Sequence, residues 1–159
     1  MPFNHFDESG RAVMVDVGAK EPTHRKAVAR ATVFLKKETV AAVATGGVKK
    51  GDVLGIARIA GIAAAKRTSE IIPLSHPVSI TSASIDFEVD GERGTIGVTS
   101  TVKAFDRTGV EMEAMVSASV AALTIYDMCK GADRGISIGD VFLLSKEGGR
   151  SGVYRRTAS

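Results

Sequence analysis

One segment of this chain, residues 113–130, is apolar on nearly every face of the helix that it predicts. The segment reads EAMVSASVAALTIYDMCK and consists mostly of alanine, serine and larger apolar side chains. A helix without a polar stripe has no side to present to water, so it is expected to be buried on several sides. The rest of the chain therefore has to pack around this helix.

Four further segments are rich in β-branched and apolar side chains, and most of them alternate apolar with polar positions, as β-strands do. They are residues 28–36, 78–89, 95–104 and 136–145. The turn-forming sequence DGERG at 90–94 joins the second and third of them into a hairpin. The apolar phase of the last strand shifts at Gly139 and Asp140, which predicts a β-bulge there.

Two helices are expected before the hairpin. The first covers 38–45 and ends at a pair of glycines, and the second begins near Asp52, a good N-cap, within the helix-compatible run at 53–72. The elements then follow as strand, helices, strand, strand, helix, strand, which is the split β-α-β pattern. We expect an α+β fold, a ferredoxin-like sandwich in which helices pack on one face of an antiparallel sheet.

The ends of the chain carry weaker signals. Residues 1–27 read as a loose leader in which 14–17 resemble a short strand, and the C-terminal tail is basic and rich in glycine. The chain of 159 residues is expected to form one domain, 1–159, with flexible termini at about 1–12 and 148–159.

Composition narrows the classes of function. A single cysteine, Cys129, favours a reducing compartment, and no apolar run approaches a membrane span or a secretory signal, so we expect a cytoplasmic protein that binds no membrane. The net charge of +3 and the scarcity of aromatic side chains argue against a nucleic-acid partner. A small anionic substrate needs only a few well-placed cations.

The sequence KKGD at 49–52 is the first candidate for chemistry. Lysines before a helix oppose its macrodipole, so Lys50 either belongs to a solvated loop or helps to bind an anion at the helix N-terminus.

His76 is the second candidate, because Pro73 and Pro77 fix the backbone around it. It either fills a structural hydrogen-bonding role or transfers protons near neutral pH. The three histidines of the chain have no metal-ligand spacing, so no metal site is expected.

The ends of the 113–130 helix are the third candidate. Glu111 and Glu113 suit a helix N-terminus, whereas Asp127 in the last turn is opposed by the helix dipole. Lys130 lies three positions later on the same face, so the two form either a plain surface ion pair or a proton-transfer couple.

The length of the 113–130 helix separates the candidate residues at its two ends. Glu113 and Asp127 are 14 residues apart, so a straight helix places them ~21 Å from each other. One small substrate does not span both ends of such a helix. We therefore favour a two-fold assembly in which Asp127 and Lys130 of one copy meet His76 and Lys50 of another.

Five ordered blocks of this sequence resemble the cyclic pyranopterin monophosphate synthase (MoaC) family of molybdenum cofactor (molybdopterin) biosynthesis. They are MVDVGAK at 14–20, KGDVLGIARIAGIAAAKRT at 50–68, IIPLSHP at 71–77, TGVEMEAMVSASVAALTIYDMCK at 108–130 and SKEGGRSG at 145–152. The resemblance implies a ferredoxin-like fold and a homo-hexamer, a trimer of dimers, with sites at a subunit interface. It also implies a lyase that converts 3′,8-cyclo-7,8-dihydro-GTP into cyclic pyranopterin monophosphate and pyrophosphate.

The resemblance also implies which residues form the active site. Catalytic positions fall on Lys50, His76, Asp127 and Lys130, and substrate-binding positions fall on Leu74, Ser75, His76, Glu111, Met112, Glu113, Lys146 and Arg150. Many relatives have Cys at position 75 and Lys at position 150, so a thiol is not essential here and the tail cation has a different hydrogen-bond geometry.

These residues support a mechanistic hypothesis. Asp127 and Lys130 would act as the general acid–base couple, and the two glutamates would bind the guanine-derived edge. Lys50 would hold phosphate, His76 would hold or protonate phosphate or ring atoms, and the tail cations Lys146 and Arg150 would close over the phosphates. The sequence requires no cofactor, and Mg²⁺ would enter only with the triphosphate. The rival interpretations are a non-catalytic ferredoxin-like nucleotide-binding module and an RNA-binding domain, and the second lacks stacking aromatic side chains on its strands.

Overall fold

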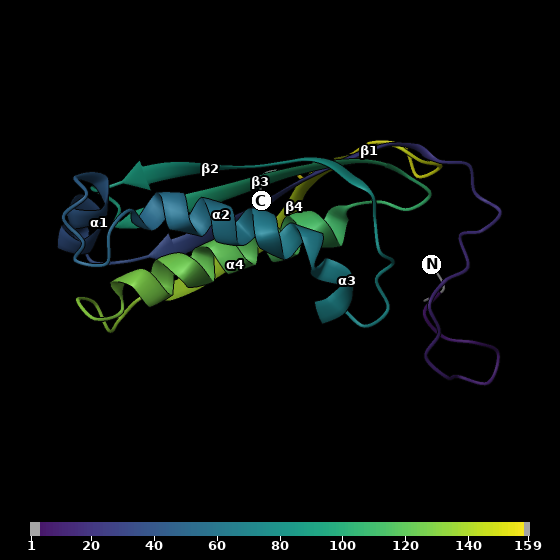
Figure 1. The fold of residues 1–159 in the computed structure, drawn as a ribbon, viewed down its shortest axis with the longest axis horizontal. Helices are drawn as coiled ribbons and strands as arrows, with labels where there is room; N and C mark the ends of the chain where they lie inside the picture. Colours follow the sequence, from purple (N-terminus) through teal and green to yellow (C-terminus); the bar gives the residue numbers. More distant parts are fainter. Residues whose placement is uncertain (1–3, 158–159) are drawn as a thin grey trace.

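Five strands form one antiparallel sheet in the computed structural model, which describes residues 4–157 (Figure 1). The elements in chain order are β1 (Thr23–Phe34), α1 (Lys37–Ala44), α2 (Val53–Lys66), α3 (Thr68–Ile71), β2 (Ile80–Asp90), β3 (Thr95–Asp106), α4 (Glu111–Cys129), β4 (Ser137–Glu147) and β5 (Tyr154–Arg155). The strand order is β2-β3-β1-β4-β5, with the first and last long strands, β1 and β4, side by side. This arrangement confirms the expected α+β, ferredoxin-like fold.

Helices α2 and α4 lie together on one face of the sheet (Figure 1). The face of β1 beneath them consists of Ala27, Ala29, Ala31 and Val33, all fully buried. Small side chains on both sides let α4 approach the sheet closely, and its own residues 118, 121, 122 and 125 are fully buried as well. The apolar helix is therefore buried against both the sheet and α2, as its composition predicts.

The contact between α2 and α4 depends on a glycine. A Cβ atom added to Gly61 would lie 2.9 Å from the carbonyl oxygen of Ser117 and would overlap the side chain of Ile85. The absence of a side chain at this position lets the two helices touch along their backbones. This packing fixes the direction of α4 and so the position of both of its ends.

Most of the predicted elements are confirmed, and the bulge is one of them. Asp140 has a φ of 51°, and the register slips between Arg30 and Thr32, so two residues of β4 lie opposite one residue of β1. Three expectations were wrong. First, β1 begins at Thr23 rather than 28, because residues 23–26 pair with the end of β3. Second, residues 14–17 form no strand.

The third correction concerns the helix-compatible run at 53–72. It breaks after Lys66 into α2 and the short α3. The Thr68 hydroxyl donates to the carbonyl oxygens of Ala64 and Ala65 at 3.2 and 3.1 Å, so a side chain satisfies carbonyls at the helix end.

Residues 1–3 and 158–159, the outer parts of the segments expected to be flexible, lie outside the described residues. In the part of the chain that the structure describes, no helix is both long and apolar enough to cross a bilayer.

We predict that Gly61→Val lowers the free energy of unfolding by about 1–3 kcal/mol, because the added side chain forces α2 away from α4. Urea denaturation followed by circular dichroism measures the change. Gly131→Ala is the matched control, since a Cβ there meets no atom within 4 Å. Equal stability of the two variants would show that the close helix contact is not needed.

Candidate active site

The predicted site residues gather at the two ends of α4. Lys50, Asp127 and Lys130 lie at the C-terminal end, and we call them the lysine cluster. Leu74, Ser75, His76, Glu111, Met112 and Glu113 line a cavity of 620 Å³ at the N-terminal end. This separation agrees with the ~21 Å that the length of the helix requires.

The lysine cluster is built on the last turn of α4. The Lys130 ammonium lies 2.7 Å from a carboxylate oxygen of Asp127, which confirms the predicted pair. The Lys50 ammonium donates to the backbone carbonyl of Asp127 at 2.9 Å and lies 4.0 Å from its carboxylate. Two cations therefore offset both the negative end of the helix dipole and the misplaced acid.

Electrostatics hold this cluster in its ionised form. The hydrogen bond and charge of Lys130, with a smaller contribution from Lys50, lower the pKa of Asp127, and the same pair raises the pKa of Lys130. In the free chain the cluster is thus a carboxylate with two ammonium groups, carrying a net positive charge. It suits an anionic ligand, and the couple transfers a proton only when a bound substrate changes these pKa values.

The placement of Lys50 corrects one expectation. Lys50 lies with Asp127 and Lys130 in the same chain, whereas we expected it to accompany His76. The expected anion site at the N-terminus of α2 is also partly occupied, because the Asp52 side chain accepts the Gly55 N–H at 2.9 Å. A capping carboxylate competes with phosphate for those N–H groups.

The N-terminal end of α4 carries a longer groove. The 620 Å³ cavity shares His5, His76 and Glu111 with a neighbouring cavity of 410 Å³. That cavity in turn shares Lys20 and Arg25 with a third cavity of 470 Å³. We call these three connected cavities the glutamate groove.

Glu113 lines the 620 Å³ cavity of the glutamate groove and is a buried acid. Its side chain is 3% exposed, and burial is the main cause that raises the pKa of Glu113 to about 7, with a smaller contribution from the charges of Glu111 and Asp106. A hydrogen bond from its own backbone partly opposes the shift. A carboxyl with this pKa exchanges a proton near neutral pH.

Glu111 has a different environment from that of Glu113. One of its carboxylate oxygens accepts a hydrogen bond from the Lys146 ammonium at 2.8 Å. Lys146 was expected to close over phosphates, but in this structure it neutralises Glu111 in the middle of the groove. The two glutamates of one helix turn therefore differ in their surroundings, since Glu111 is paired with a cation and Glu113 is buried.

His76 fixes the segment that crosses the groove. Its Nε2 lies 2.6 Å from the carbonyl oxygen of Val15. A carbonyl only accepts, so Nε2 carries the proton and Nδ1 remains for other partners. The prolines on either side of His76 therefore orient an imidazole that holds the N-terminal segment in place.

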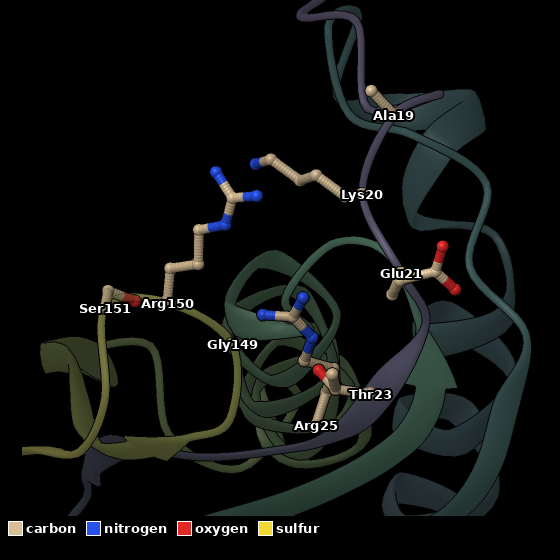
Figure 2. A pocket seen from close by; sticks show the side chains of 8 residues that line it. All are labelled: Ala19, Lys20, Glu21, Thr23, Arg25, Gly149, Arg150 and Ser151. Carbon is tan, nitrogen blue, oxygen red and sulfur yellow. The ribbon is translucent and has the colours of Figure 1, made fainter.

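The far end of the groove is cationic, and Figure 2 shows its lining. The ammonium of Lys20 and the guanidinium of Arg150 point toward one another, and Arg25 lies beneath them. Arg25 also donates to the backbone carbonyls of Asp106 and Arg107 at 3.2 and 3.1 Å, which holds its charge in place. One acid, Glu21, lines the same cavity, so three cations and one carboxylate leave an excess of positive charge that suits an anion.

Sequence reasoning missed Lys20 and Arg25. It assigned both to a loose leader, although Arg25 is part of β1. In the structure the Gly-rich tail lies directly against Arg25, because a Cβ atom at Gly149 would overlap the Arg25 guanidinium. Gly149 also has a φ of 74°, in the left-handed region that favours glycine.

Within residues 4–157, no three His, Cys, Asp or Glu side chains gather as a metal site requires. The groove instead has Glu111 and Glu113 at one end and an excess of cations, with Glu21 among them, at the other.

Comparison with known proteins points to one family. Residues 14–149 match the model of the MoaC family. The chain is 67% identical to a cyclic pyranopterin monophosphate synthase of Geotalea uraniireducens (strain Rf4), over 98% of each chain. It is 66% identical to the enzyme of that name from Geobacter metallireducens (strain ATCC 53774 / DSM 7210 / GS-15), over 98% of each chain. It is 54% identical to a cyclic pyranopterin monophosphate synthase of Clostridium perfringens (strain 13 / Type A), over 94% of this chain and 95% of that protein.

The buried glutamate gives a prediction about stability and pH. Folded Glu113 keeps its proton up to about pH 7, whereas in the unfolded chain it loses the proton near the ordinary glutamate pKa of 4.5. The folded state therefore binds more protons between these values, and the free energy of unfolding falls as pH rises through this window.

Glu113→Gln is expected to remove this fall, which is on the order of 1–3 kcal/mol. Urea denaturation of both proteins at pH 5 and pH 8 measures the difference. Glu92→Gln, an exposed position in the β2–β3 turn, is the control. An unchanged pH dependence in Glu113→Gln would mean that Glu113 is ionised throughout.

Proposed function

Because the chain belongs to the MoaC family, we propose that it is a cyclic pyranopterin monophosphate synthase, a lyase of molybdenum cofactor biosynthesis. Its substrate would be 3′,8-cyclo-7,8-dihydro-GTP, and its products would be cyclic pyranopterin monophosphate and pyrophosphate. The observation that carries the proposal is the glutamate groove, in which a carboxylate end is continuous with a cationic end. A guanine nucleotide has the complementary polarity, with N–H donors at one end and phosphates at the other.

The carboxylate end would bind the guanine-derived ring. Glu111 and Glu113 accept hydrogen bonds from ring and amino N–H groups, and the Leu74 to His76 loop forms the facing wall. Protonation of Glu113 near neutral pH adds a proton donor where the ring is rearranged. These roles agree with the substrate-binding residues expected from the sequence.

The cationic end would bind the triphosphate. Lys20, Arg25 and Arg150 surround one cavity, and an arginine matches two phosphate oxygens with its planar fork. During ring closure a substrate hydroxyl oxygen bonds to the innermost phosphorus, and the bond from that phosphorus to the bridging oxygen breaks. The cations would stabilise the charge that gathers on the departing pyrophosphate.

The lysine cluster would come from a second copy of the chain. In a two-fold dimer the C-terminal end of one α4 faces the groove of the other copy, so two equal sites form. Ile56, Ile59 and Leu123 on α2 and α4 are 43%, 70% and 56% exposed, and their apolar surface supports assembly through this helix layer. Three such dimers would make the homo-hexamer implied by the resemblance.

Within that shared site, Asp127 and Lys130 would act as the general acid–base couple of ring opening and pterin closure. Lys50, which lies beside them, would stabilise developing negative charge. The proton of the attacking hydroxyl would pass to the Asp127 carboxylate. Mg²⁺ would enter only with the triphosphate, and a cytoplasmic location agrees with the single buried cysteine.

Incubation with 3′,8-cyclo-7,8-dihydro-GTP tests the proposal through the release of pyrophosphate. Asp127→Asn should lower turnover by about 10²–10⁴-fold, since a general acid–base group contributes about that much. Asp127 is exposed, so the melting temperature should stay unchanged. Asp86→Asn, an exposed acid on β2, is the control. Saturable binding without turnover by the unmodified protein would instead indicate a nucleotide-binding module.

Mixing inactive variants tests the shared site. A hybrid dimer of His76→Ala and Asp127→Asn has one site with neither change, and hybrids make up half of a random mixture. About a quarter of the full activity should therefore return. Lys50→Ala mixed with Asp127→Asn should recover none, because both changes lie in the lysine cluster. Equal recovery in the two mixtures, or none in the first with hybrids confirmed by mass spectrometry, would refute the arrangement.

A further inference from the structure

The N-terminal hairpin, residues 5–13, forms part of the groove wall although it precedes the matched family region, which begins at residue 14. Phe6 and Ala12 pair as an antiparallel bridge, and the Val13 N–H donates to the carbonyl of His5 at 2.9 Å. Asp7 holds the turn, because its carboxylate accepts from the backbone of Ser9 and from the backbone and side chain of Arg11. The hairpin is thus organised by its own contacts.

The hairpin lies over the glutamate end of the groove. His5 and Ala12 line the 620 Å³ cavity together with the Leu74 to His76 loop and the first turn of α4. His5 also lines the adjoining cavity that contains Lys146. Directly after the hairpin, the bond from His76 to the Val15 carbonyl ties the chain to the groove.

Few packing contacts hold the hairpin against the protein. Phe6 and Val13 of the hairpin are 57% and 41% exposed, and Met14, directly after it, is 48% exposed. A segment held by turn contacts and one anchor opens at low free-energy cost, so a ligand beneath it supplies the contacts that it lacks. His5 is the hairpin side chain with hydrogen-bonding nitrogens that lines both cavities.

We propose that His5 is a substrate-contacting residue, and that the hairpin covers the guanine-derived ring bound at Glu111 and Glu113. This inference rests on the proposed function, since it takes the ring of that substrate as the ligand. An imidazole offers the ring a flat face to stack on and a nitrogen for hydrogen bonding.

Steady-state kinetics of His5→Ala test the proposal. The KM for 3′,8-cyclo-7,8-dihydro-GTP should rise about five- to tenfold, the effect of one lost contact of ordinary strength, without a change in melting temperature. Glu8 is an exposed residue of the same hairpin, and Glu8→Ala should leave the KM and the melting temperature unchanged. Unchanged kinetics of His5→Ala, with an active unmodified protein, would overturn the inference and leave the proposed function intact.

A second measurement does not depend on turnover. The chain contains no tryptophan, so Phe6→Trp places a single reporter on the hairpin. In an Asp127→Asn background, titration with the same nucleotide should change the emission saturably, and adding His5→Ala should shift the midpoint to higher concentration. No emission change at saturating nucleotide would overturn the inference. Absence of turnover by the unmodified protein would instead count against the proposed function.

Discussion

The close packing of α4 against the sheet and α2 is the constraint on which the rest of this structure depends. Alanines in β1 and in α4, and a glycine in α2, bring three backbones together without large side chains between them. A helix held this way is straight and fixed, so its two ends are set at a distance that no side chain can bridge. The two glutamates lie at one of these ends and the lysine cluster at the other.

The same helix also sorts the charges. Its N-terminal turn carries Glu111 and Glu113, and its C-terminal turn is surrounded by Lys50 and Lys130, so each end attracts the charge that the helix dipole favours. At most of these positions the charge needed for ligand binding also stabilises the helix, but two residues are exceptions. Asp127 opposes the dipole and needs two lysines, and Glu113 is buried at the cost of a raised pKa. Both exceptions are candidate catalytic or substrate-binding residues.

Sequence reasoning was most reliable where periodicity and caps control local structure. The order of elements, the Asp52 cap, the bulge at Asp140 and the Asp127–Lys130 pair follow from spacing alone. It failed where tertiary contacts decide: the first residues of β1 are strand because β3 pairs with them, and Lys50 reaches α4 across 77 positions of sequence. Lys20 and Arg25 were missed because a cationic cavity between a leader and a tail has no local pattern.

The Gly-rich segment that carries Arg150 has both of its ends secured. Glu147 closes β4 on one side, and the short pairing of β5 with β4 through Lys146 and Tyr154 closes the other. The loop between β4 and β5 takes its shape from three glycines with positive φ. The conformational entropy of closing this loop is lost during folding and not when a ligand binds. An anion that enters the cavity therefore meets the Arg150 guanidinium on a loop that is already ordered. Truncated chains that end before Tyr154 would lack this preorganisation even though they retain Arg150.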